Sequence, residues 1–128
     1  MVTAPIAILI LVCLYYTGRM TIAEAKFQQA LIFASQKQAK NSYDTMRDTI
    51  NLNPYVDRYR LTYSQLNLAL ALNISNKKDV SAQDRNIISQ LVQQAIREGR
   101  VSVAINPERA GIWQNLGSIY KAIIPLAK

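Results

Sequence analysis

The chain begins with an apolar run and then changes to apolar positions spaced three or four residues apart. Residues 2–18 contain no charged side chain, and the first one is Arg19. Seventeen uncharged residues lie at the short end of the length that crosses a bilayer as a helix. Tyr15, Tyr16 and Arg19 follow the order of an interfacial aromatic belt and an anchoring cation. The pattern predicts a single membrane span over residues 1–18, with these three residues at the membrane interface.

Two other interpretations fit part of the same run. A secretory signal favours a basic start and a small-x-small cleavage site, and neither is present. A buried core helix of a soluble protein also fits a run of this length. The basic residues follow the span, which by the positive-inside rule alone would place the remainder in the cytoplasm. That rule fails if the chain is the tail of a longer multi-span protein, so the side of the membrane stays open.

Amphipathic helices are predicted after the span. No Gly or Pro lies between Arg19 and Asn53, so the first helix is expected to continue out of the membrane without a break. Apolar periodicity predicts further helices over residues 43–52, 55–73, 82–103 and 112–124. The expected start and stop signals are Asn41 or Ser42, Asn53 with Pro54, Ser81 with Asp84, and Pro125. No hairpin dipeptide or sustained alternation is present, so the predicted fold is all-α.

The composition argues against catalysis. The chain has no His and a single cysteine, Cys13, which excludes an intrachain disulfide and most zinc or histidine chemistry. No phosphate-binding glycine loop, nucleophile elbow or metal-ligand cluster occurs. The net charge of +7 is spread along the chain after Arg19 without a basic block, so no specific nucleic-acid partner is expected. We expect a protein that is not an enzyme and uses no cofactor.

The segment from Trp113 to Tyr120 reads W-x2-L-G-x2-Y. This pattern resembles the opening of a tetratricopeptide (TPR) repeat. In such a helix Trp113, Leu116 and Tyr120 would fill the gap between paired helices, and Gly117 would let the partner helix cross closely. Pro107 would break the chain one turn before the helix.

A weaker second copy of the pattern precedes it. Tyr59, Tyr63 and Leu66 have the same mutual spacing as Trp113, Gly117 and Tyr120, and they begin five residues after Pro54 where the others begin six residues after Pro107. In the intervening helix, Ala95 and Gly99 are small where a paired helix must pack, and Gly99 indicates a close helix crossing. The resemblance covers residues 21–128 and implies antiparallel helix pairs stacked as a TPR-like array over residues 19–128, with the last repeat incomplete. The alternative is an unrelated helical bundle.

The order of these parts also looks like the C-terminal region of bacterial membrane proteins of the O-antigen ligase or polymerase type that carry TPR tails. Any glycan-transfer chemistry would then belong to upstream membrane helices outside this chain. The last helix would lack its partner, which would leave Trp113 and Ile119 partly uncovered.

The resemblance implies a partner-binding surface, because TPR arrays bind peptides or proteins on a concave face. Mapped through the repeat, that face would contain Arg60, Ser64, Asn67, Gln114, Ser118 and Lys121, unless these are merely solvated polar positions. Arg60 and Lys121 would favour an anionic group. The expected function is a membrane-tethered, non-catalytic protein–protein interaction module. The alternative is a structural subunit that self-associates through the apolar N-terminal helix and the uncovered C-terminal helix.

Overall fold

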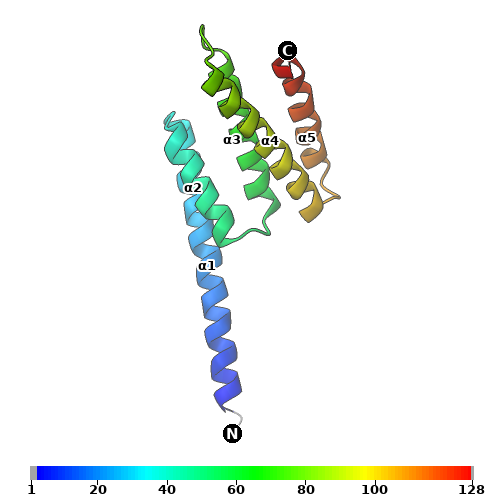
Figure 1. Ribbon diagram of the computed structural model, residues 1–128. Helices are drawn as coiled ribbons and strands as arrows, with labels where there is room; N and C mark the ends of the chain where they lie inside the picture. The colour runs from blue at the N-terminus through cyan, green and yellow to red at the C-terminus, as the bar shows by residue number, and fades with distance from the viewer. Residues whose placement is uncertain (1–2, 128) are drawn as a thin grey trace. The chain divides into compact units, whose positions relative to one another are not determined.

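The computed structural model describes residues 3–127, which form five α-helices and a short 3-10 helix (Figure 1). The all-α prediction is therefore confirmed, and no strand occurs within these residues. The chain divides into two compact units, Met1–Pro54 and Tyr55–Lys128. The helices are α1 (Thr3–Ser35), α2 (Ala39–Leu52), α3 (Asp57–Ser75), α4 (Ala82–Ile105), α5 (Ala110–Ile123) and η1 (Ile124–Ala127).

In the first unit, α1 is a single helix of 33 residues, so the predicted continuation past Gly18 and Arg19 is confirmed. Residues 1 and 2 of the predicted span lie outside the described residues, as does Lys128 at the other end of the chain. Residues 3–18 are exposed throughout, and the first buried residue of α1 is Ala23. The helix thus changes from fully exposed to packed without a change in its backbone.

The C-terminal half of α1 packs against the antiparallel helix α2. Ala23, Phe27 and Ala30 recur at helical spacing and are buried, as are Met46 and Ile50 of α2. The second helix begins at Ala39, which is earlier than the predicted caps Asn41 and Ser42. Ser42 is buried instead, and its hydroxyl donates a hydrogen bond of 2.9 Å to the carbonyl of Ala30. Ser42, which was predicted as a cap, therefore forms a contact between α2 and α1.

The second unit consists of the antiparallel pair α3 and α4, with α5 packed mainly against α4. Val103, Ile112 and Leu116 form a buried cluster against which Leu61 packs. Gly99 is buried, and a Cβ built on it would meet the Cδ1 atom of Leu116 at 3.1 Å. The close helix packing predicted at Gly99 is confirmed, and the side chains that approach it are Leu116 and Ile119 of α5 and Ser64 of α3.

Helix boundaries follow some of the predicted signals. Ser81 and Asp84 form a capping box at the start of α4, as predicted. Pro125 lies in η1, after α5 has ended at Ile123. Pro54 was expected in the first turn of the third helix, but α3 begins at Asp57 and Pro54 lies in the preceding turn. The Oδ1 atom of Asp57 accepts the backbone N–H of Arg58, which satisfies a donor of that first turn.

Candidate functional site

The exposed part of α1 has the length and composition of a membrane span. Its most apolar window of 18 residues has a mean hydropathy of 1.8, and 6% of that window is buried. A core helix of a soluble protein would be mostly buried, so the exposure argues against that interpretation. A signal sequence near the N-terminus meets the same criteria of length and composition.

The predicted membrane-interface residues lie together on α1. The rings of Tyr15 and Tyr16 meet edge to face with centroids 5.6 Å apart, and the Arg19 guanidinium lies 5.8 Å from the Tyr15 centroid. Arg19 also donates hydrogen bonds to the carbonyls of Asn51 at 3.2 Å and Leu52 at 2.9 Å. Those carbonyls end α2, where intrahelical donors are missing. Arg19 therefore joins the exposed segment to the end of the packed pair.

The predicted concave face does not form one exposed surface. Ser64 and Asn67 are fully buried, so the prediction that they contact a partner is wrong. Ser64 donates its hydroxyl to the carbonyl of Ala95 at 2.7 Å, and Asn67 donates its amide to the carbonyl of Tyr63 at 2.7 Å. These acceptors lie within α3 and α4, so both side chains serve the internal packing of the unit.

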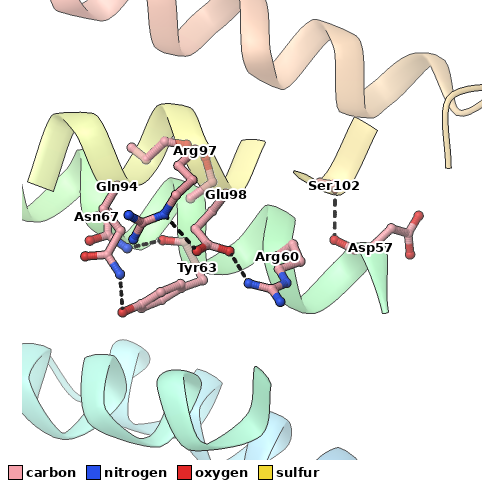
Figure 2. A network of polar contacts seen from close by, with 10 residues as sticks. Asp57, Arg60, Tyr63, Asn67, Gln94, Arg97, Glu98 and Ser102 are labelled. Carbon is pink, nitrogen blue, oxygen red and sulfur yellow. Dashed lines mark hydrogen bonds and ion pairs between the residues drawn. The ribbon is translucent and has the colours of Figure 1, made fainter. Parts of the chain in front are cut away.

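Arg60 also forms an ion pair within the second unit (Figure 2). Its guanidinium donates to the Glu98 carboxylate at 2.7 Å, with side-chain exposures of 18% and 7%. The largely exposed Arg97 lies 3.7 Å from the same carboxylate, and Gln94 donates to the Tyr63 hydroxyl at 2.8 Å. A desolvated carboxylate needs such partners, because an unpaired buried charge is costly. This network holds α3 against α4.

The three candidates on α5 are exposed, but they are separated from the others. Gln114, Ser118 and Lys121 lie on the solvent side of the helix, where the Ser118 hydroxyl donates to the Gln114 carbonyl at 3.0 Å. Arg60 is the fourth candidate with any exposure, and it is bonded to Glu98. The six residues therefore do not converge on one ligand.

The residues of the TPR-like signature lie on two different faces of α5. Leu116 is buried, whereas Trp113 is 52% exposed and Tyr120 is 41% exposed. The buried face carries Ile112, Leu116 and Ile119, so the partial exposure predicted for Trp113 is confirmed and that predicted for Ile119 is wrong. The face of α5 that packs into the interior of the unit is therefore shifted by one residue along the helix from the face that the sequence predicted.

Gly117 and the two aromatic residues have other surroundings than predicted. No atom lies within 4 Å of a Cβ built on Gly117, so the close crossing expected there is absent from the described residues. The indole N–H of Trp113 donates to the carbonyl of Pro107 at 2.8 Å, and Arg100 donates to the Tyr120 hydroxyl at 3.1 Å. Among the remaining predicted packing residues, Tyr59, Tyr63 and Ala95 are buried and Leu66 is partly buried.

Asp57 ties the start of α3 to the connection between α4 and α5. Its Oδ2 atom accepts hydrogen bonds from Asn106 and Arg109, both at 3.1 Å. Its carbonyl accepts the Ser102 hydroxyl at 3.0 Å (Figure 2). Partial burial alone would raise the pKa of Asp57. The hydrogen bonds from Arg109, the Arg58 backbone and Asn106 outweigh it, so the pKa lies below its ordinary value.

An open groove of about 780 Å³ lies within the second unit and was missed by sequence reasoning. Its walls come from the end of α3, the start of α4 and the segment that follows α5. The apolar lining residues are Leu72, Val80, Ile88, Val92, Ile123, Pro125 and Leu126, and the polar ones are Ser75, Asn76, Arg85 and Ser89. The sequence signal was the spacing of Arg85, Ile88 and Val92 along one face of α4, which also fits an ordinary core stripe.

The described residues contain no group of three or more potential metal ligands from His, Cys, Asp and Glu. No family model, curated protein or solved structure matches this chain. The site is therefore defined by its own geometry, which offers an exposed apolar helix and an open groove rather than a constellation of catalytic groups.

Proposed function

We propose that the protein is a membrane-tethered, TPR-like, non-catalytic interaction module. The observation that carries this proposal is the continuity of α1, which runs from an exposed apolar segment into a packed helix pair without a break. A continuous helix transmits position and orientation better than a flexible linker does. The packed pair of α1 and α2 would therefore be held at a fixed height and angle above the bilayer.

Two further observations support the tether. The aromatic pair Tyr15 and Tyr16 and the cation Arg19 follow the apolar segment in the order that membrane interfaces favour. The hydrogen bonds from Arg19 to Asn51 and Leu52 would then fix the end of α2 at the level of the headgroups. The arrangement leaves the side of the membrane open.

The TPR-like part of the proposal is supported by antiparallel helix pairs and by the close approach of α5 to Gly99. An interaction role suits such a fold because its apolar groove and helix faces remain open to solvent. The order of parts further favours a tail of the O-antigen ligase or polymerase type. In that case the module would serve chemistry located outside this chain.

Light scattering on two proteins tests the tether. We expect the full chain to require detergent and residues 20–128 to form a helical monomer in buffer. The control is the double substitution Leu9→Glu and Leu11→Glu in the full chain, which places two charges in the exposed apolar segment and should release it from liposomes in a flotation assay. If the unmodified chain stays soluble without detergent and does not float with liposomes, the tether is wrong.

Self-association is the second candidate function, and one observation favours it. Trp113, Tyr120 and Ile124 are exposed along one side of the C-terminal helical segment, with the open Gly117 between them. A second helix could approach closely at Gly117. Because Trp113 is the only Trp, iodide quenching of its fluorescence reports directly on this face. Protection of Trp113 that grows with protein concentration would favour assembly, and constant quenching in a monomer would exclude it.

A further inference from the structure

We propose that the groove between α4 and η1 binds an acidic peptide segment, with apolar side chains in the groove and a carboxylate at Arg85. This inference rests on the proposed interaction function and names the chemistry of its partner. Ile88 and Val92 of α4, Leu72 of α3 and Ile123 at the end of α5 supply the apolar walls. None of these residues belongs to the concave face expected from sequence.

The groove follows from how α5 packs. The helix meets α4 closely at Gly99 and Val103, where the side chains of Leu116 and Ile119 pack against the bare backbone of Gly99. From there α4 and α5 move apart toward the end of α5, as Figure 1 shows. Ile88 and Val92, in the N-terminal half of α4, thus line an open groove and remain only partly buried. The groove volume of about 780 Å³ lies in the range of ligand-binding clefts.

Charge selects the partner. Among the described residues that line the groove, Arg85 alone has an ionisable side chain. Its guanidinium forms no hydrogen bond or ion pair with the residues that the structure describes, unlike Arg60, Arg97 and Arg109, which each have a carboxylate partner. A guanidinium beside an apolar groove complements a ligand that carries a carboxylate next to apolar groups.

The polar groups favour a peptide over a fatty acid. Asn76 and Ser89 line the groove among the apolar side chains, and the Asn76 side-chain amide forms no hydrogen bond with the described residues. A peptide backbone offers N–H and C=O groups to such side chains, whereas an acyl chain offers none. An acyl chain over the Asn76 side chain would displace its water without offering a hydrogen bond in return. The observations therefore favour a peptide.

The test begins with a phage-displayed library of random twelve-residue peptides, selected on the full chain in detergent micelles. We expect enriched peptides to combine at least one Asp or Glu with several apolar residues. The binding of a labelled enriched peptide is then measured by fluorescence anisotropy. The substitution Arg85→Glu should weaken binding by about three- to tenfold, because a partly solvated ion pair is lost and a repulsion replaces it.

Lys121→Glu is the matched control. It makes the same change of charge on an exposed residue of α5 outside the groove, and it belongs to the concave face predicted from sequence. We expect it to change the affinity by less than about twofold. Methyl NMR of the unmodified chain gives a readout that needs no variant. The Ile88 and Ile123 methyl signals should shift with the peptide, and those of the buried Ile112 should not.

Several results would overturn the inference. Peptides whose affinity depends on Lys121 and not on Arg85 would locate binding on α5, which leaves the interaction function standing and removes the groove. Peptides without acidic residues would remove the role of Arg85. Binding of dodecanoate that shifts the Ile88 and Ile123 methyl signals, with no enriched peptide doing so, would make the groove a fatty-acid site. A library that yields no binder at all counts against the interaction function itself.

Discussion

Gly99 and Leu116 lie so close that a Cβ on Gly99 would stand 3.1 Å from the Leu116 Cδ1 atom and 3.4 Å from that of Ile119. Replacing Gly99 by Val would force these buried side chains out of their positions. We expect Gly99→Val to destabilise the unit by about 1–3 kcal/mol, the usual cost of overpacking. Urea unfolding of the full chain in detergent, followed by far-UV circular dichroism, measures this change.

Gly117 provides the matched control, because it also lies inside a helix but has no atom within 4 Å of a built Cβ. We expect Gly117→Ala to stabilise the protein by about 0.5–1 kcal/mol, since alanine has the higher helix propensity and meets no obstacle. Equal effects of the two substitutions would mean that α5 does not cross at Gly99.

These two glycines also show how far the sequence leads. The helix boundaries of α4, the capping box and the crossing at Gly99 follow from local signals that the fold preserves. The buried face of α5 does not follow from local signals, because apolar residues occupy both the Trp113–Gly117–Tyr120 stripe and the Ile112–Leu116–Ile119 stripe. Local spacing cannot choose between two apolar stripes one residue apart. That choice depends on which of them fits Gly99 and Val103.

The misplaced binding face has a related cause. Ser64 and Asn67 are polar, and on a single helix they look solvated. In the fold the Ser64 hydroxyl donates to the Ala95 carbonyl of α4 and the Asn67 amide donates to the Tyr63 carbonyl of its own helix, while the buried Asn67 Oδ1 atom has no hydrogen-bond partner among the described residues. A sequence does not show that Ser64 will face the Ala95 carbonyl across a helix interface, nor that tertiary packing will bury Asn67. The groove was missed for the same reason, since its walls come from three separate segments.

Removing one partner of the Arg60–Glu98 ion pair should lower the free energy of unfolding strongly, whereas replacing both partners by apolar residues should lower it little. Glu98 is 5% exposed and bonded to Arg60 at 2.7 Å, so Glu98→Ala leaves a partly buried guanidinium without its carboxylate. We expect a loss of about 3 kcal/mol in the free energy of unfolding. The double substitution Arg60→Met and Glu98→Leu should recover most of that loss, because it removes both desolvated charges. Urea unfolding compares the variants. If the double variant loses as much free energy of unfolding as Arg60→Met and Glu98→Leu lose when their separate losses are added, the charges themselves are required.

Asp57 should make the second unit sensitive to acid. Its pKa is lowered in the fold, so its contribution to stability is fully present above the unfolded pKa of about 3.9 and is lost as the pH falls from there through the folded pKa. Thermal unfolding between pH 7 and pH 3 should therefore show a drop below about pH 4. Asp57→Asn should lower stability at pH 7 and make that drop smaller. A remaining drop is expected from Asp84, whose pKa is lowered mainly by its hydrogen bond with the Ser81 side chain. An unchanged drop in Asp57→Asn would refute the role of Asp57.

Arg19 should determine how firmly the end of α2 is held. Its two hydrogen bonds reach the carbonyls of Asn51 and Leu52, which have no donor within their own helix. Arg19→Met keeps an apolar stem and removes the donors, at a cost of about 1 kcal/mol for a partly exposed charged hydrogen bond. Local opening of the last turn of α2 should then be about fivefold more frequent. Hydrogen exchange of amides 49–53 in detergent micelles, read by mass spectrometry, measures this opening.

The matched control is Lys26→Met, which removes an ion pair between the same two helices. Lys26 meets Asp48 at 3.3 Å with side chains 37% and 51% exposed, so its loss should change exchange little. Faster exchange in both variants would indicate a general loosening of the helix pair. No change in Arg19→Met would show that these hydrogen bonds do not hold α2, and would remove the link proposed between the membrane interface and the packed helices. Faster exchange confined to Arg19→Met would show that Arg19 holds the last turn of α2.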